Sequence, residues 1–154
     1  MEPTFILADD AATRALGAAL AGLLKAGDVI ALHGDLGAGK TTLTRGLIQA
    51  LCGADEDVPS PTYTLVQAYD GPGFPIWHFD LYRLDRPDEV RELGWDETQA
   101  GVALIEWPDR AGRYLPTPSW RVPGGAMPCA RRSDRMLRRA AISGWCGQMP
   151  RRHC

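Results

Sequence analysis

The segment HGDLGAGKTTL, residues 33–43, constrains the possible folds of this chain more than any other stretch. It matches the phosphate-loop pattern G-x-x-x-x-G-K-[ST], whose fixed positions are Gly34, Gly39, Lys40 and Thr41. An apolar run at 29–32 precedes the loop and is typical of a buried strand. After the loop, Leu47, Ile48 and Leu51 have the spacing of one helix face, which predicts a helix. Because this strand–loop–helix order separates a true phosphate loop from a chance match, we expect a nucleoside triphosphate to bind here.

The residue types of the loop suit the groups of a triphosphate. Successive backbone N–H groups and the following helix N-terminus can surround phosphate oxygens, and this predicts contacts from Asp35, Leu36, Gly37, Ala38, Gly39, Lys40, Thr41 and Thr42. Lys40 places a positive charge near the β- and γ-phosphates, and the hydroxyl of Thr41 suits Mg²⁺. The chain has no asparagine and hence no N-K-x-D guanine motif, so ATP is the expected nucleotide.

Two acids stand at the ends of apolar strands further along the chain. Asp80 follows IWHF and Glu106 follows GVALI, and the carboxyl ends of parallel strands meet at one edge of a sheet. Both acids could hold Mg²⁺ together with Thr41 or orient the attacking water, so Lys40, Asp80 and Glu106 are the predicted catalytic residues. His78 alternates with Asp80, and we expect it to pack on one sheet face rather than to ligate anything. Arg83 could neutralise phosphate or pair with the acidic segment 85–97.

These patterns predict an α/β, P-loop NTPase-type three-layer fold, with a mostly parallel sheet flanked by helices. We expect one ATPase domain over residues 1–118 and an atypical arginine-rich tail over 119–154. Residues 1–119 carry nine basic and eighteen acidic side chains, whereas residues 120–154 carry eight arginines and one acid. The tail is either a basic segment that contacts tRNA phosphates or out-of-frame translation. The second reading is favoured because hydrophobic periodicity ends abruptly, and we expect no strand from Trp120 onward.

Other sequence features predict the cellular location of the protein and bear on zinc binding and disulfides. The chain shows no leader-like N-terminus and no apolar run of the ~20 residues needed to cross a membrane, so we expect a cytoplasmic protein that makes no membrane contact. None of its four cysteines belongs to a C-x-x-C pair, so the sequence predicts neither a zinc site nor a disulfide framework.

Five blocks together resemble one family, the bacterial TsaE (YjeE) ATPases of tRNA threonylcarbamoyladenosine biosynthesis. The blocks are GDLGAGKTT (34–42), SPTYTLV (60–66), HFDLYRL (78–84), ELGWDE (92–97) and LIEWPD (104–109). The resemblance covers roughly residues 4–118. It implies a P-loop ATPase with little activity alone, which works with TsaD and TsaB in placing threonylcarbamoyl on adenosine 37 of tRNAs that read ANN codons.

The resemblance also implies roles for individual residues. It implies that Lys40 and Thr41 hold phosphate and magnesium, and that Ser60 and Thr62 lie in a switch-like segment. Asp80 would be the acid of the second motif and Glu106 a metal-side acid. Asp10 would lie near the adenine. Because the body of the chain is acidic, any contact with tRNA is expected to pass through the partner proteins.

Two other function classes stay open at this point. A P-loop small-molecule kinase would use Asp80 as the base for an acceptor hydroxyl, and phosphate release without any acceptor would count against it. A nucleotide-gated binding module without useful catalysis would keep its partner's function after Glu106 is mutated.

Overall fold

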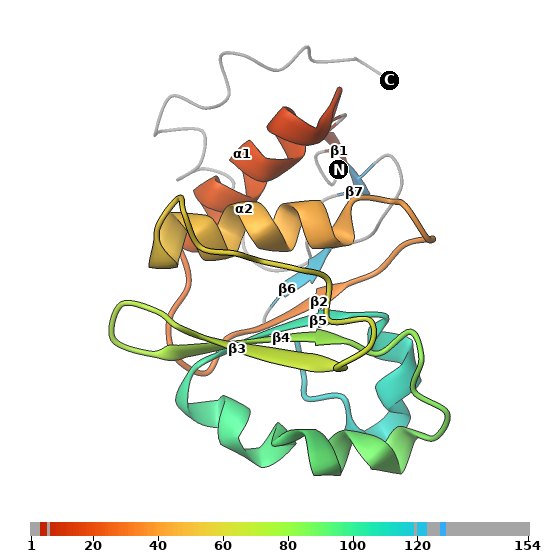
Figure 1. The fold of residues 1–154 in the computed structure, drawn as a ribbon. Helices are drawn as coiled ribbons and strands as arrows, with labels where there is room; N and C mark the ends of the chain where they lie inside the picture. The colour runs from red at the N-terminus through yellow and green to blue at the C-terminus, as the bar shows by residue number, and fades with distance from the viewer. Residues whose placement is uncertain (1–3, 6, 119, 123–126, 129–154) are drawn as a thin grey trace.

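A five-stranded sheet forms the middle layer of the protein (Figure 1). The computed structural model describes residues 4–5, 7–118, 120–122 and 127–128. The sheet has the strand order β3-β4-β5-β2-β6, with bounds Val66–Asp70 for β3, Pro75–Asp80 for β4, Val102–Glu106 for β5, Val29–Leu32 for β2 and Trp120–Val122 for β6. Only β3 runs antiparallel to its neighbour, so the sheet is mostly parallel.

Helices cover both faces of this sheet (Figure 1). The α-helices α1 (Asp10–Ala21) and α2 (Lys40–Cys52) lie on one face. Three 3-10 helices lie on the other: η1 (Pro87–Leu93), η2 (Trp95–Ala100) and η3 (Pro108–Tyr114). The three-layer α/β fold expected from the sequence is therefore confirmed. A separate antiparallel pair joins β1 (Thr4–Phe5) to β7 (Met127–Pro128).

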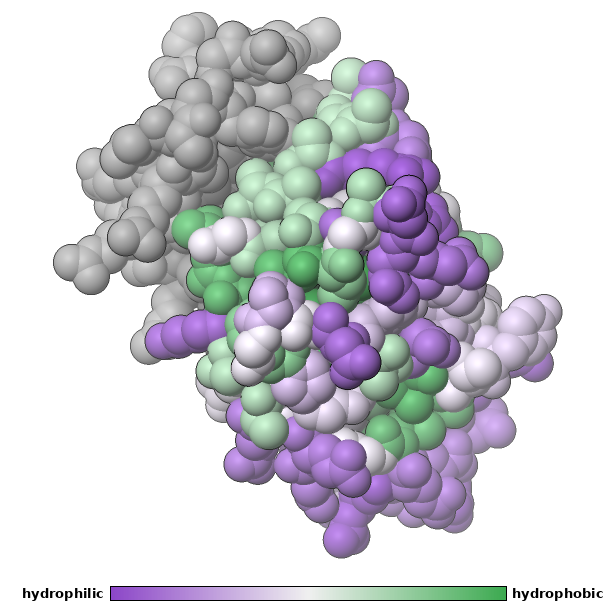
Figure 2. All heavy atoms as spheres, turned by 60° about the vertical axis from the view of Figure 1, so that its left-hand side comes forward, coloured by the Kyte–Doolittle hydropathy of each residue, from purple (hydrophilic) through white to green (hydrophobic). Residues whose placement is uncertain are grey.

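Each side of the sheet has its own hydrophobic cluster, as the alternation of strand residues requires. On the α-helical side Ile76, Leu104 and Ile30 pack with Leu43 and Leu47 of α2. On the other side the apolar residues Phe79, Ile105, Leu81, Val90 and Trp95 pack together. The outer side of the 3-10 layer is hydrophilic, as the lower part of Figure 2 shows, and its acids Asp88, Asp96 and Glu97 are exposed.

The helices α1 and α2 pack at unusually short range because glycines stand at their contact. Asp9 caps α1, its carboxylate accepting the N–H of Ala12 at 2.8 Å. A Cβ on Gly46 would stand 2.2 Å from the carbonyl oxygen of Arg14. A Cβ on Gly17 would stand 2.2 Å from that of Leu43. The backbones of the two helices are therefore in direct contact.

The expectation that no strand follows residue 119 is wrong for the described residues. Residues 120–122 form β6, which pairs in parallel with the loop-bearing strand β2, and the N–H of His33 donates to the carbonyl of Val122 at 2.7 Å. Residues 127–128 form β7. Three residues are enough to fill the free edge of β2, although Pro123 and the glycines after it follow at once. The arginines at 131–139, on which the rest of that expectation depends, lie outside the described residues.

Two segments depart from regular strand and α-helix. Strand β3 begins only at Val66, because residues 62–64 form a turn that ends at Leu65, whose φ is 65°. The acidic segment begins with a 3-10 helix at Pro87. Within the described residues, no helix is both long enough and apolar enough to span a membrane.

Candidate functional site

The loop between β2 and α2 has the backbone that a phosphate cradle needs. Gly34, Gly37 and Gly39 have φ values of 134°, 79° and 90°, a region that residues with a side chain rarely adopt. Gly39 stands at the N-cap of α2, so the free N–H groups of the first helical turn face the loop. Residues 36–42 line a pocket of about 270 Å³. Seven of the eight predicted loop contacts, all except Asp35, thus lie around one concave site.

Lys40 is the first residue of α2 and has only 8% of its surface exposed. Its Nζ donates to the carbonyl oxygens of Gly34 and Asp35, both at 2.7 Å, and lies 4.2 Å from the centre of the Trp107 ring. Burial lowers the pKa of Lys40, while the negative charges of Glu106, Asp80 and Asp35 oppose that shift. The loop carbonyls and the aromatic face thus hold a cation at the edge of the pocket.

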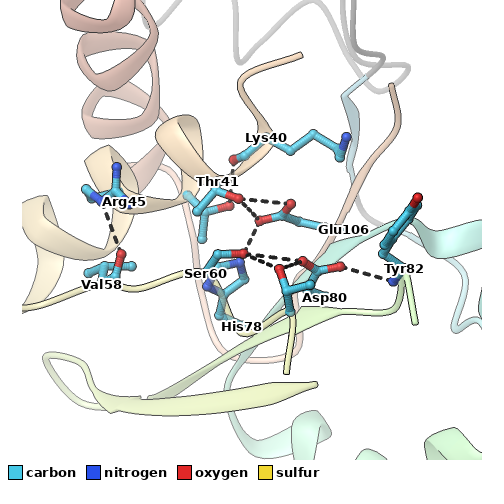
Figure 3. Close-up of polar contacts among 11 residues, drawn as sticks. Lys40, Thr41, Arg45, Val58, Ser60, His78, Asp80, Tyr82 and Glu106 are labelled. Atoms are coloured by element: carbon cyan, nitrogen blue, oxygen red, sulfur yellow. Dashed lines mark hydrogen bonds and ion pairs between the residues drawn. The ribbon is translucent and has the colours of Figure 1, made fainter. Parts of the chain in front are cut away.

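The two predicted acids lie beside each other at the carboxyl edge of the sheet. Asp80 ends β4, Glu106 ends β5, and the two residues are partners in the parallel register. Both are buried and both line the pocket. The hydroxyl of Thr41 donates to Glu106, at 2.9 Å from Oε1 and 3.1 Å from Oε2 (Figure 3). The structure thus brings Asp80 and Glu106 together at one edge of the sheet, with Thr41 in contact with Glu106.

Asp80 is hydrogen-bonded to the segment 60–62. Its Oδ2 accepts from the hydroxyls of Thr62 at 2.8 Å and Ser60 at 3.3 Å, and those two hydroxyls are 2.7 Å apart. Its Oδ1 accepts the backbone N–H of Tyr82 at 3.0 Å (Figure 3). Ser60 and Thr62 both line the pocket. The segment 60–62 therefore contacts the phosphate-loop site through the carboxylate of Asp80.

Glu106 has a second buried partner, which the sequence did not reveal. The Nε2 of His78 lies 2.8 Å from Glu106 Oε1, and His78 is fully buried. The expectation that His78 packs on a sheet face is confirmed, since it shares the α-helical side of β4 with Ile76 and Asp80. The two-residue spacing of His78 and Asp80 in the sequence indicated that both lie on one face of a strand. The contact of His78 with Glu106 could not be predicted without knowing the register of β4 against β5.

Aromatic side chains surround the pocket. Tyr82 and Trp107 line it, with ring centres 5.0 Å apart. Trp107 has a left-handed backbone with φ 57°, which turns the chain immediately after Glu106. Arg83 lies over the exposed Tyr63 ring, 4.8 Å from its centre. Neither Tyr82 nor Trp107 was among the residues that the sequence patterns assigned to the site.

Two predicted ATP contacts stand apart from the pocket lining. Asp35 takes part through its backbone carbonyl, which accepts from Lys40. Asp10 forms an exposed ion pair with Arg14 at 2.9 Å and does not line this pocket. The start of α1 is nevertheless close to the loop, because a Cβ on Gly39 would stand 3.6 Å from the Cγ2 of Thr13.

The donor atoms of the site decide which metal would suit it. In the described part of the chain, no group of three or more His, Cys, Asp or Glu side chains is arranged to hold a metal ion by itself. The site offers a hydroxyl from Thr41 and carboxylates from Asp80 and Glu106. Such hard oxygen ligands, few in number and next to a phosphate cradle, suit Mg²⁺ bound together with nucleotide phosphates.

Comparisons with known proteins agree on one family. The model of the family described as "Threonylcarbamoyl adenosine biosynthesis protein TsaE" matches residues 7–131. The tRNA threonylcarbamoyladenosine biosynthesis protein TsaE of Rickettsia bellii is 43% identical over 114 residues, covering 73% of this chain and 79% of that protein. The protein of the same name from Bacillus subtilis is 42% identical over 106 residues, covering 68% and 65%. The crystal structure of Bacillus subtilis YdiB aligns with a TM-score of 0.68 and 26% identity, covering 94% of this chain and 95% of that one.

Proposed function

The chain belongs to the TsaE family of threonylcarbamoyl adenosine biosynthesis proteins, and on that premise we propose that it binds and hydrolyses Mg²⁺-ATP. The hydrolysis would support the threonylcarbamoylation of adenosine 37 in tRNAs that read ANN codons. The protein would act with a TsaD–TsaB-type complex and have little activity alone. It would work in the cytoplasm.

One observation carries the ATPase part of this proposal. The loop residues 36–42, the cation of Lys40 and the carboxylates of Asp80 and Glu106 converge on one pocket of about 270 Å³, although they come from three separate segments of the chain. Phosphoryl transfer needs little covalent chemistry from a protein. It needs positioning and charge stabilisation, and a backbone cradle, a lysine and a metal-side acid pair supply both.

Each residue then has a defined task. Lys40 would exchange its two carbonyl contacts for the β- and γ-phosphate oxygens, which are stronger acceptors. Thr41 and Glu106, with Asp80, would hold Mg²⁺, which neutralises phosphate charge when it is bound. The contacts of Ser60 and Thr62 with Asp80 would make that acid sensitive to the position of the segment 60–62.

The charge distribution supports indirect contact with tRNA. Residues 1–119 carry nine basic and eighteen acidic side chains, so this part of the protein repels a polyanion. The tRNA would therefore be presented by the partner proteins, and this chain would act on the partner complex.

The test compares the two lysines of the chain. Lys40→Ala should abolish ATP binding or hydrolysis while thermal unfolding stays cooperative, because it removes the only lysine at the pocket. Lys25→Ala removes the other, exposed lysine and should leave both unchanged. ATP binding is followed by titration calorimetry, and phosphate release is followed with Mg²⁺ and the TsaD–TsaB complex, without any small-molecule acceptor. Wild-type hydrolysis in a folded Lys40→Ala protein would refute the proposal. Phosphate release only on adding an acceptor would indicate a kinase.

A further inference from the structure

His78 occupies a place where packing alone would favour an apolar side chain. It is fully buried on the α-helical side of β4, opposite Leu104 of β5 and next to Ile76 along its own strand face. An imidazole buried in such a place loses its hydrogen bonds to water, and this costs free energy unless the protein replaces them. Leucine or phenylalanine would fill similar space without that cost. The polar side chain therefore needs an explanation beyond packing.

The contacts of its two nitrogens supply that explanation. Within the described residues Nδ1 has no hydrogen-bond partner, whereas Nε2 lies 2.8 Å from Oε1 of Glu106. Because an ionised carboxylate only accepts, the bond places the proton on Nε2, with His78 as donor. The hydrogen bonding of this imidazole is thus directed at one carboxylate of the candidate site.

Glu106 has two donors from different elements, and both contact its Oε1. Thr41, at the start of α2, donates from the helix side, and His78 donates from within the sheet (Figure 3). In the proposed Mg²⁺-ATP complex the hydroxyl of Thr41 is shared with the cation. His78 lies in the core behind the carboxylate and does not line the pocket, so a nucleotide in the pocket would not compete for its hydrogen bond.

We infer that His78 is a positioning residue for hydrolysis: its Nε2–H fixes the carboxylate of Glu106 in the orientation that the metal and water need. The inference rests on the proposed ATPase function. It differs from a purely structural role because it requires a donor at Nε2. Losing that donor lowers turnover while nucleotide affinity, which depends on the loop and Lys40, changes little.

The experiment compares three single variants with the wild-type chain in the presence of the partner complex. His78→Gln keeps an amide donor near the position of Nε2, and His78→Leu fills the space without a donor. Ile76→Leu is the matched control, since it alters packing at a fully buried position on the same strand face without a polar contact. The measurements are kcat for phosphate release, the calorimetric Kd for ATP and the Tm of each protein.

His78→Leu should lower kcat on the order of tenfold or more, with Kd within about threefold of the wild type, because small misplacements of a reacting group cost rate rather than affinity. His78→Gln should recover much of the loss, and Ile76→Leu should keep wild-type kcat. In the His78→Leu background, Glu106→Gln should cost far less than it does alone, since the two side chains act as one unit.

Three results would overturn the inference: unchanged kcat in His78→Leu, equal kcat losses in His78→Gln and His78→Leu, or additive losses in the double variant. If His78→Leu proves unstable, His78→Phe, which also fills the space without a donor, takes its place in the comparison with His78→Gln. A wild-type chain that hydrolyses no ATP would instead refute the proposed function, so the two failures are distinguishable.

Discussion

Replacing Gly46 by alanine tests whether the close approach of α1 and α2 holds the phosphate loop in place. The added Cβ would stand 2.2 Å from the carbonyl oxygen of Arg14 and 2.6 Å from its Cα. Side-chain carbons essentially never come closer than 3.0 Å to such atoms, so the helices must separate by roughly 0.8 Å. The obstructing atoms belong to the backbone and cannot rotate away.

The expected magnitude follows from two opposing terms. Overpacking of a close-packed interior costs about 1–3 kcal/mol, and a rigid backbone neighbour places Gly46→Ala at the upper end. Alanine regains about 1 kcal/mol of helix propensity over glycine. The free energy of unfolding should therefore fall by about 2 kcal/mol, measured by urea denaturation. Because α2 begins at Lys40, a shift of this helix should also weaken ATP binding.

Gly22→Ala is the matched control. Gly22 follows the last residue of α1 with φ −68° and ψ −4°, and its added Cβ would meet nothing closer than 4.0 Å. That substitution should stabilise the protein by about 0.4–1 kcal/mol, because it restricts only the unfolded chain. If Gly46→Ala were as stable as Gly22→Ala, the reasoning from direct backbone contact would be refuted.

Two further predictions concern Tyr69 and Asp80. The hydroxyl of Tyr69 is buried with no hydrogen-bond partner among the described residues, so Tyr69→Phe should raise the free energy of unfolding by about 1 kcal/mol in urea denaturation at pH 8. Burial also raises the pKa of Tyr69 from 10.0 to about 12, so the unfolded chain loses the proton first. The contribution of Tyr69 to the free energy of unfolding should therefore fall as the pH rises from 10 to about 12 and stay constant below pH 10. In Tyr69→Phe this part of the fall in stability at alkaline pH should be missing. Asp80→Ala should reduce phosphate release strongly while calorimetry still detects ATP binding, because metal and water positioning act mainly in the transition state; loss of binding alone, with normal turnover at saturation, would contradict this role.

The parts of the fold that the sequence predicted are those in which local pattern and tertiary structure agree. The run at 29–32 is apolar throughout because β2 is buried on both faces, and the glycines of the loop are required by its backbone angles. Asp80 and Glu106 were found because the ends of parallel strands meet at one edge. Each of these inferences needed only a short stretch of sequence.

The parts that were missed depend on contacts between distant segments. Nothing near His78 indicates that its imidazole reaches Glu106, since that contact follows from the pairing of β4 with β5. The three residues of β6 are too few to show periodicity, and they form a strand because the free edge of β2 offers hydrogen-bonding groups. The positions of Tyr82 and Trp107 at the pocket likewise result from turns after Asp80 and Glu106.

The pairing of β2 with β6 also sets an order of events during protein synthesis. The loop-bearing strand lies near the start of the chain, yet one of its two neighbours is made only when residues 120–122 leave the ribosome. Until then this edge of β2 is unpaired and could pair with other extended chains. Contacts between segments so distant in sequence also form slowly. The nascent protein therefore carries the loop at 33–40 on an incomplete sheet until residues 120–122 are made, and the pairing of β2 with β6 is completed late.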